Sequence, residues 1–306
     1  MCVGFWSLEH PQYALILCSN RDEYLSRPTA PAHFHSFGNI GPDTESEKTI
    51  LSGRDLRAGG TWLGVGLDGK TALLTNITEE AGQYGSSRGQ LVSSFLLPSP
   101  PPSQSLLADH MARTVAENIP YAGFNLLLLS PKWSGEGEAQ PKLSFEGAHV
   151  TNHGGGGNIV ARSLTDAERH HGGLSNGIEG KGADEWPKVK QGLNLFSDVL
   201  DSITAELDEL ELAEQLFQLL TWKSDSPPRE RGELRNTIHI EPLTIGVQSP
   251  DTPPDYYGTR LSTVILVGRD GRTLFIERDI WTLDAENKLT RGDAKHQRAF
   301  RFHLRA

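Results

Sequence analysis

Runs of apolar residues predict β-strands near both ends of the chain. Three pairs of runs flank short turn-like segments and so predict antiparallel hairpins: residues 3–8 with 13–19, 61–67 with 71–77, and 261–268 with 273–281. The turn of the second pair contains Asp68-Gly69, a dipeptide typical of two-residue hairpin turns. Further strands are expected at residues 125–130, 142–150 and 236–241.

Helical periodicity occupies the middle of the chain. Leu107, Met111 and Val115 recur four residues apart within residues 104–118, and similar patterns cover residues 184–200 and 204–222. Because strands and helices do not alternate, this order favours an α+β fold with antiparallel sheets over a doubly wound parallel fold. Segments rich in Pro, Ser, Gly or charge are expected to be loops near residues 98–105, 132–141, 154–157 and 223–233.

Charge and composition narrow the possible function classes. Of 306 residues, 29 are basic and 39 are acidic, and the net charge of −10 disfavours nucleic acid and anionic membranes as partners. No apolar run approaches the ~20 residues that cross a bilayer, so no transmembrane segment is expected. The amino-terminal residues lack the basic start of a signal peptide, which makes the cytoplasm the default location.

The chain has two cysteines, Cys2 and Cys18, which are too few for a disulfide framework or a four-cysteine zinc site. Two histidine pairs, at residues 33 and 35 and at residues 170 and 171, lack a third ligand at a suitable spacing. We therefore expect no metal and no cofactor.

Cys2 is the residue whose position points most directly to chemistry. Removal of the initiator methionine would make it the first residue of the mature chain. A terminal cysteine combines a thiol nucleophile with an α-amine whose pKa, about 7.7–8.0, suits it to accept the thiol proton. Such a group attacks amide or ester carbonyls. Two alternatives stay open: a packed strand cysteine, and a redox pair with Cys18 on a neighbouring strand.

A polar segment, Ser19 to Glu23, follows the apolar run at residues 13–18. The predicted hairpin returns this segment to the vicinity of Cys2. Arg21 is placed to lower the pKa of the Cys2 thiol, and Asp22 to orient the α-amine; an exposed, salt-bridged turn is the alternative. Strict alternation along a strand would turn only one of Arg21 and Asp22 toward Cys2, unless the backbone turns there.

Asn20-Arg21-Asp22-Glu23, on a chain that starts Met-Cys, resembles the N-R-D-E motif of the transport and Golgi organisation protein 2 family. The resemblance extends over nearly the whole chain. It includes Gly59-Gly60-Thr61-Trp62-Leu63-Gly64, Leu74-Thr75-Asn76, Ser87-Arg88-Gly89, Leu174-Ser175-Asn176, Trp186-Pro187-Lys188-Val189 and Tyr257-Gly258-Thr259-Arg260.

The resemblance implies a fold and a set of site residues. The family is similar to the N-terminal-nucleophile hydrolases, which form a four-layer αββα sandwich, here as one domain over residues 1–306 with insertions at the four loops named above. By position, the matches to the catalytic residues of bile-salt-hydrolase-like amidases are Cys2, Arg21, Asp22, Asn76, Asn176 and Arg260. Asn20, Glu23 and Trp62 are candidates for substrate binding, although sheet packing also explains Trp62.

Two functions follow from the resemblance. One is a role in Golgi organisation, protein secretion and lipid or haem homeostasis, as a carrier built on a hydrolase scaffold. The other is an active cysteine amidohydrolase that cleaves an acyl-amide bond through Cys2. A small acyl or lipid-like ligand, or haem, would be the partner, and the cytoplasm, with association to the Golgi or mitochondria, would be the location.

Overall fold

The computed structural model describes residues 2–38, 48–80, 82–98, 106–134, 141–245 and 255–305. Its strands form two large sheets in which every pairing is antiparallel. The first sheet has the order β10 (Gly172–Leu174), β1 (Val3–Ser7), β2 (Tyr13–Tyr24), β12 (Tyr256–Gly268), β13 (Arg272–Asp279) and β16 (Arg298–His303), with β11 (Leu243–Thr244) also on β12. The second has the order β3 (Thr29–His35), β4 (Ile50–Asp55), β5 (Leu63–Gly66), β6 (Thr71–Asn76), β7 (Phe124–Ser134), β8 (Lys142–Thr151) and β9 (Val160–Ser163). A separate ribbon pairs β14 (Trp281–Leu283) with β15 (Leu289–Arg291).

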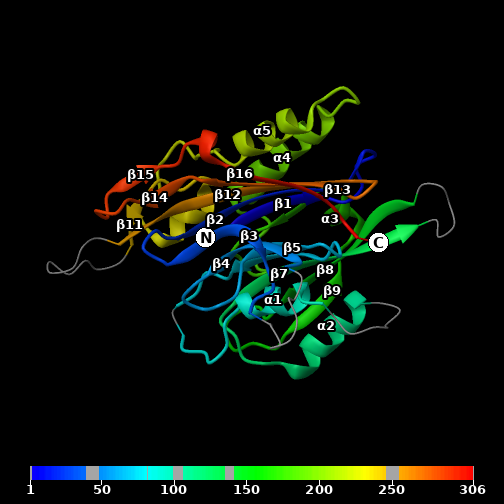
Figure 1. Cartoon of the computed structure of the whole chain (residues 1–306). Helices are drawn as coiled ribbons and strands as arrows, with labels where there is room; N and C mark the ends of the chain where they lie inside the picture. Colours follow the sequence, from blue (N-terminus) through cyan, green and yellow to red (C-terminus); the bar gives the residue numbers. More distant parts are fainter. Residues whose placement is uncertain are drawn as a thin grey trace.

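Helices cover the outer face of each sheet, so the molecule has four layers (Figure 1). Helices α4 (Pro187–Asp201) and α5 (Glu209–Leu219) lie on the first sheet, and α1 (Gly89–Leu96) and α2 (Leu106–Glu117) lie on the second. A short helix, α3 (Asp166–His170), contacts β1 and β10, and two 3-10 turns, η1 (Arg231–Asn236) and η2 (Ala294–His296), complete the elements. The expected α+β fold with an αββα arrangement is confirmed.

Three large hydrophobic clusters of the described residues lie between these layers, and a fourth, small one surrounds Leu234, Ile240 and Tyr257. The first lies between the two sheets and includes Leu17, Leu51 and Leu127. The second joins the first sheet to α4 and α5, and the third joins the second sheet to α1 and α2. Since most strands are covered on both faces, they read in the sequence as nearly continuous apolar runs. This is why the amino-acid pattern alone suffices to predict the hairpins.

Helix α4 approaches β1 closely because Gly192 has no side chain. A Cβ atom at this position would lie 2.0 Å from Cζ of Phe5. Lys188 and Phe196 lie four residues before and after Gly192 and are also buried. The face of α4 that meets the sheet therefore carries a lysine, and this lysine becomes important at the candidate site.

The structure changes two details of the predicted elements. Residues 237–241 are irregular rather than a strand; Ile238 and Ile240 are buried, but the backbone N–H and C=O of this segment bond to Trp222 and Thr259. Helix α5 begins only at Glu209, because the Asp208 side chain caps it by accepting from the Leu210 N–H. Residues 104–105 of a predicted helix lie outside the described residues.

The predicted loops fall partly within the described residues. Residues 154–157 connect β8 and β9 without helix or strand, and residues 223–230 are likewise irregular before η1 begins. Residues 132–134 instead belong to the end of β7. Residues 99–105 and 135–140 lie outside the described residues.

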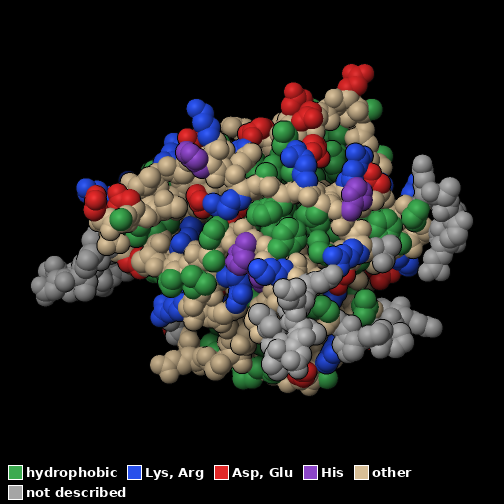
Figure 2. Space-filling model, viewed as in Figure 1, with side chains coloured by type: hydrophobic (Ala, Val, Ile, Leu, Met, Phe, Trp, Pro, Cys, Tyr) green, Lys and Arg blue, Asp and Glu red, His purple; other side chains and the backbone are tan. Residues whose placement is uncertain are grey.

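The surface mixes charges of both signs. On the face shown in Figure 2, lysine and arginine side chains are interspersed with acidic ones across both sheets. Across the described part of the chain, none of the helices combines the length and the apolar character that a bilayer crossing requires.

Candidate functional site

Cys2 lies directly before β1, beside the polar end of β2. The register pairs Val3 with Asn20, which brings Cys2 next to Arg21 and Asp22. The Cys2 Sγ donates to the Asp22 carbonyl oxygen at 3.9 Å, and the Cys2 carbonyl accepts from Ser175 Oγ at 2.9 Å. The hairpin predicted from the apolar runs is thus the element that joins Cys2 to the polar segment.

A pocket of about 100 Å³ opens at Cys2. Six residues of the predicted set line it: Cys2, Arg21, Asp22, Glu23, Trp62 and Asn76. Further lining residues that the sequence did not single out as site residues are Arg27, Asp55, Thr61, Leu74, Ser87, Arg88 and Gly89. Three basic and three acidic side chains therefore surround one thiol in a space that is small for a ligand pocket.

Strand β12 has an irregularity opposite Arg21 and Asp22. Asp22 pairs with Thr259 and Arg21 pairs with Leu261, so Arg260 is an extra residue between them. A bulge of this kind bends the strand and re-aims the neighbouring side chains. The side chains of Arg21 and Asp22 nevertheless alternate as expected for a strand: Arg21 stacks on Trp62 between the sheets, whereas Asp22 interacts with Lys188 of α4 on the outer side.

The Arg21 guanidinium is held by an aromatic ring rather than by close carboxylates. Arg21 is 5% exposed, and its Cζ lies 4.0 Å from the centroid of the Trp62 ring. Its Nη2 lies 3.8 Å from Glu23, and Nη1 has no hydrogen-bond partner within the described part of the chain. A buried cation therefore lines the Cys2 pocket.

Asp22 and Lys188 place opposite charges behind Cys2. The Asp22 Oδ1 accepts from Thr259 Oγ1 at 2.7 Å, and its carbonyl accepts from the Tyr257 hydroxyl at 3.0 Å. Burial raises the pKa of the Asp22 carboxyl, and the charge of Lys188 opposes that rise. Burial likewise lowers the pKa of Lys188 to about 8, although Asp22 and Cys2 favour its charged form.

Burial also governs the thiol itself. It raises the pKa of Cys2, the Asp22 charge adds to that rise, and Arg21 lowers it. In this arrangement Cys2 is held mainly as the protonated thiol, so a nucleophilic role requires a base close to Sγ.

Asn176 lies behind the pocket rather than in its wall. Its Nδ2 donates to the Asn76 carbonyl oxygen, and its Oδ1 accepts from Lys188 Nζ at 3.3 Å. Through these bonds Asn176 ties Asn76, which does line the pocket, to the buried lysine of α4. The structure thus brings Asn176 to the site as a positioning group.

Arg260 and Asn20, like Asn176, are predicted site residues that the structure does not bring into the pocket lining. The Arg260 Nη1 donates to carbonyls of the turn after β2, at Leu25 (3.2 Å) and Arg27. The Asn20 amide donates to the carbonyls of Leu220 and Ile238 and accepts from Ser262 Oγ at 2.6 Å. Both side chains brace the elements around the end of β2.

Lys188 is the main residue that the sequence reasoning missed. The sequence contained a signal for it, because Lys188, Gly192 and Phe196 follow one another at steps of four residues and so share the apolar face of α4. A lysine on such a face is rare unless it is paired. Arg88 was missed as well; its Nη1 donates to the Gly123 carbonyl at 2.9 Å at the edge of the pocket.

Cys18 belongs to the core and not to this site. It pairs with Phe5 in the β1–β2 register and is buried among residues of the first sheet, α4 and α5. Both cysteines are free thiols, and burial strongly raises the pKa of Cys18. Within the described residues, no group of three or more His, Cys, Asp or Glu side chains is arranged to hold a metal ion.

Curated relatives match the chain over most of its length. They include the Transport and Golgi organization protein 2 homologs of Bos taurus, 29% identical over 92% of this chain and 93% of that protein, and of Homo sapiens, 29% identical over 95% and 97%. The Transport and Golgi organization protein 2 of Drosophila melanogaster is 26% identical over 93% and 94%.

Two solved structures resemble this one at low sequence identity. One is a Caenorhabditis elegans ortholog of N-acylethanolamine-hydrolyzing acid amidase, with 11% identity, a TM-score of 0.45, and coverage of 87% of this chain and 92% of that chain. The other is the C2A mutant of conjugated bile acid hydrolase from Clostridium perfringens, with 10% identity, a TM-score of 0.45, and coverage of 99% and 98%.

The match to a family profile is also nearly complete, since it spans residues 1–282 of the 306. The motif resemblance in the sequence, the long curated matches and this profile agree. This chain therefore belongs to the family described as Transport and Golgi organisation 2.

Proposed function

We propose that this protein is an N-terminal-nucleophile cysteine amidohydrolase in which Cys2, as first residue after removal of Met1, attacks a small acyl amide. One observation carries the proposal. The Cys2 pocket contains the buried Arg21 guanidinium, stacked on Trp62, with an Nη1 that has no hydrogen-bond partner within the described ranges. A preorganised cationic donor beside a nucleophile is what a developing oxyanion requires.

The reaction runs in two steps that share one proton carrier. The α-amine of Cys2 takes the thiol proton, and Sγ forms a bond to the amide carbonyl carbon while Arg21 and Asn76 donate to the carbonyl oxygen. The carbon–nitrogen bond then breaks, and the amine leaves with that proton. Water, deprotonated by the same α-amine, attacks the thioester, releases the carboxylic acid and restores the thiol.

The other site residues serve this chemistry by position and charge. In this proposal Asp22, fixed by Thr259, holds the new terminal ammonium, and Lys188 offsets its buried charge. Asn176 holds the carbonyl of Asn76. The volume of about 100 Å³ favours a short acyl group, with the amine portion of the substrate at the arginine-rich rim formed by Arg27 and Arg88.

We propose further that this activity serves Golgi organisation and protein secretion; the names of the family and of its relatives refer to transport and Golgi organisation. A cytoplasmic protein in contact with the Golgi or mitochondria would suit that role.

A second candidate is a carrier of a lipid-like ligand or haem that has lost the hydrolytic step. One observation favours it: burial raises the pKa of Cys2 and so keeps the thiol protonated.

Acylation of Cys2 tests the first candidate. Purified full-length protein is mixed with p-nitrophenyl acetate, and the p-nitrophenol burst and the intact mass are recorded. We expect a stoichiometric burst and the addition of one acetyl group on a chain that lacks Met1. Cys2→Ala should abolish both. Cys18→Ala is the matched control, because it removes the other buried thiol, and it should leave both unchanged.

Three outcomes would count against the hydrolase. They are a native protein that retains Met1, a burst that survives Cys2→Ala, and absence of acetylation in a protein whose melting temperature shows that it is folded. In that case, saturable binding of haem or of a short acyl-CoA by the same preparation would favour the carrier.

A further inference from the structure

The three arginines that line the Cys2 pocket differ in their partners. Arg27 binds the Asp55 carboxylate with its Nη2 at 2.6 Å. Glu23 lies 3.8 Å from Arg21 and 3.7 Å from Arg27, so its charge is shared between them. Arg88 also lines the pocket, but its guanidinium makes no ion pair with a carboxylate of the described residues.

The guanidinium of Arg88 is held in place without being saturated. Its Nη1 donates to the Gly123 carbonyl at 2.9 Å. Its Nε and Nη2 have no hydrogen-bond partner in the described part of the chain, and they are open to solvent, unlike the buried Nη1 of Arg21. Two cationic donors at the edge of the pocket are therefore accessible to a ligand.

Glu79 does not neutralise Arg88 at close range, because backbone amides hold its carboxylate. Its Oε1 accepts from the Gly123 N–H at 2.6 Å, and its Oε2 accepts from the Gly155 N–H at 2.7 Å. Burial lowers the pKa of Arg88, and the charge of Glu79 opposes this without forming an ion pair. A guanidinium stays protonated at pH 7 in such surroundings. Arg88 is thus a partly buried cation without a close counterion, an arrangement that an anionic ligand would stabilise.

The acidic residues of the pocket have cations elsewhere. Glu23 and Asp55 face the other two arginines of the lining. Asp22 is opposed by the charge of Lys188 behind the pocket. Among the described residues around Cys2, Arg88 is therefore the cation that is left to pair with a ligand.

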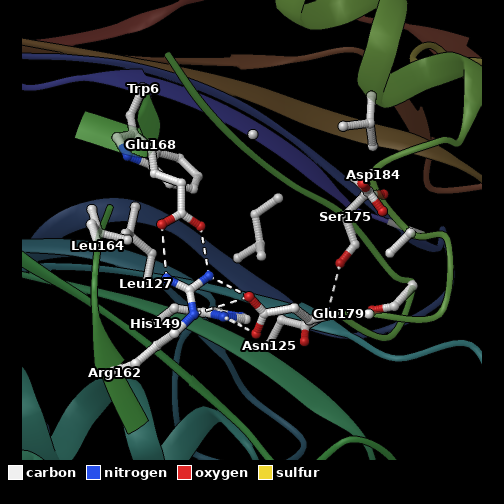
Figure 3. Close-up of a pocket in the computed structure, with 16 residues that line it drawn as sticks. Trp6, Asn125, Leu127, His149, Arg162, Leu164, Glu168, Ser175, Glu179 and Asp184 are labelled. Carbon is white, nitrogen blue, oxygen red and sulfur yellow. Dashed lines mark hydrogen bonds and ion pairs between the residues drawn. The ribbon is translucent and has the colours of Figure 1, made fainter. Parts of the chain in front are cut away.

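A larger cavity provides a contrast. It has a volume of about 310 Å³ and lies between the two sheets, where Leu127 and Leu164 form part of its walls. The arginine of its described lining, Arg162, is bound on two sides by Glu168 and Glu179 (Figure 3). A ligand with a negative charge is therefore favoured at the Cys2 pocket and disfavoured at this cavity.

We propose that the amide cleaved at Cys2 is an N-acyl amino acid whose carboxylate is bound by Arg88. This substrate class deepens the proposed function and rests on it. The Cys2 Sγ forms a bond to the acyl carbon, the carbon–nitrogen bond breaks, and the amino acid leaves with the thiol proton on its nitrogen. Water then attacks the thioester and releases the carboxylic acid, which restores the thiol.

The order of these steps places the carboxylate on the amine portion of the substrate. The amine leaves before water attacks the thioester, so it must occupy the side of the pocket that is open to solvent. Arg88 is on that side, because its Nε and Nη2 are solvent-accessible. The acyl group takes the remaining space of about 100 Å³, which suits a short chain.

Calorimetric titration of full-length Cys2→Ala tests this recognition without turnover. N-acetylglycine should bind at least about tenfold more tightly than N-acetylglycinamide, its neutral counterpart, because only the carboxylate pairs with the guanidinium. N-methylsuccinamate carries its carboxylate on the acyl side and should bind as weakly as the neutral amide. Arg88→Met in the same background should weaken N-acetylglycine binding about tenfold and remove the preference, whereas Arg88→Lys should keep part of it.

Arg57→Met is the matched control. Arg57 is exposed, follows β4 in the sequence and is not part of the pocket lining. Its substitution removes the same charge as Arg88→Met and should leave the preference for N-acetylglycine unchanged. If Arg88→Met does not fold, the relative affinities of the three ligands for Cys2→Ala still decide the question.

Turnover by the wild type separates this substrate class from the hydrolysis itself. Glycine release from N-acetylglycine should exceed glycinamide release from N-acetylglycinamide at least about tenfold in kcat/KM. The proposal is overturned by equal affinities of these two ligands, by tighter binding of N-methylsuccinamate, or by an unchanged preference in folded Arg88→Met, even where the p-nitrophenyl acetate burst shows that Cys2 is acylated. Absence of the burst together with a retained preference would overturn the hydrolysis and leave Arg88 as an anion-binding residue.

Discussion

The Cys2 pocket and the cavity between the sheets differ in how they hold charge. Behind Cys2, Asp22 and Lys188 are almost completely buried, 3% and 0% exposed, and each depends on the other. At the cavity, the side chains of Arg162 and Glu179 are 37% and 40% exposed, and water screens their attraction. Charge in the first region is therefore costly to disturb, whereas in the second it is partly exposed and contributes little to stability.

Lys188→Met should show the largest effect. It removes the cation beside Asp22 and leaves the Asn176 Oδ1 without the Lys188 donor, so unfolding free energy should fall by about 3 kcal/mol or more. Urea unfolding measures this. Lys190→Met is the matched control on the same helix; its side chain is 56% exposed, and it should change stability by about 0.5 kcal/mol or less. If the two variants lowered the free energy of unfolding equally, the buried charge behind Cys2 would not be more important for stability than an exposed one.

The pH dependence of stability gives a smaller effect of predictable sign. The pKa of Lys188 is about 8 in the folded protein against 10.5 ordinarily. Below pH 8 both states hold the proton and stability does not change with pH through this group. Between the two pKa values the unfolded state binds a proton that the folded state has released. The free energy of unfolding should therefore rise with pH, by up to about 1.4 kcal/mol per pH unit.

Lys188→Met should lack this slope. The quantity to measure is the difference in unfolding free energy between wild type and variant from pH 7 to pH 10, in which contributions from other groups cancel. A difference that stays flat across this range would mean that Lys188 is not desolvated.

Arg162→Gln should give the smallest effect. Its pairs with Glu168 and Glu179 are partly exposed, so the loss of stability in urea should be below about 1 kcal/mol. A loss of 3 kcal/mol would show instead that this network is as structural as the buried pair.

Much of the fold and part of the site were predictable because they depend on local pattern. The hairpins, the αββα layers and the proximity of Cys2 to Arg21 follow from apolar runs, turn residues and a recognisable motif. The wrong strand at residues 236–241 had the right apolar residues, but their backbone found partners in other segments. Neither the bulge at Arg260 nor the partners of its guanidinium leave any mark in the local sequence.

The sequence by itself determined the layers, the chemistry available at Cys2 and the hairpin that carries it to Arg21 and Asp22. Only the tertiary structure decided which side chains share a space: Lys188 behind Asp22, Asn176 behind Asn76, and Trp6 with His149 in one cavity wall. The physical reason is that periodicity reports whether a side chain is buried. Which partner the side chain meets there depends on contacts between residues a hundred or more positions apart. The same contacts decide whether its hydrogen bonds and its charge are satisfied.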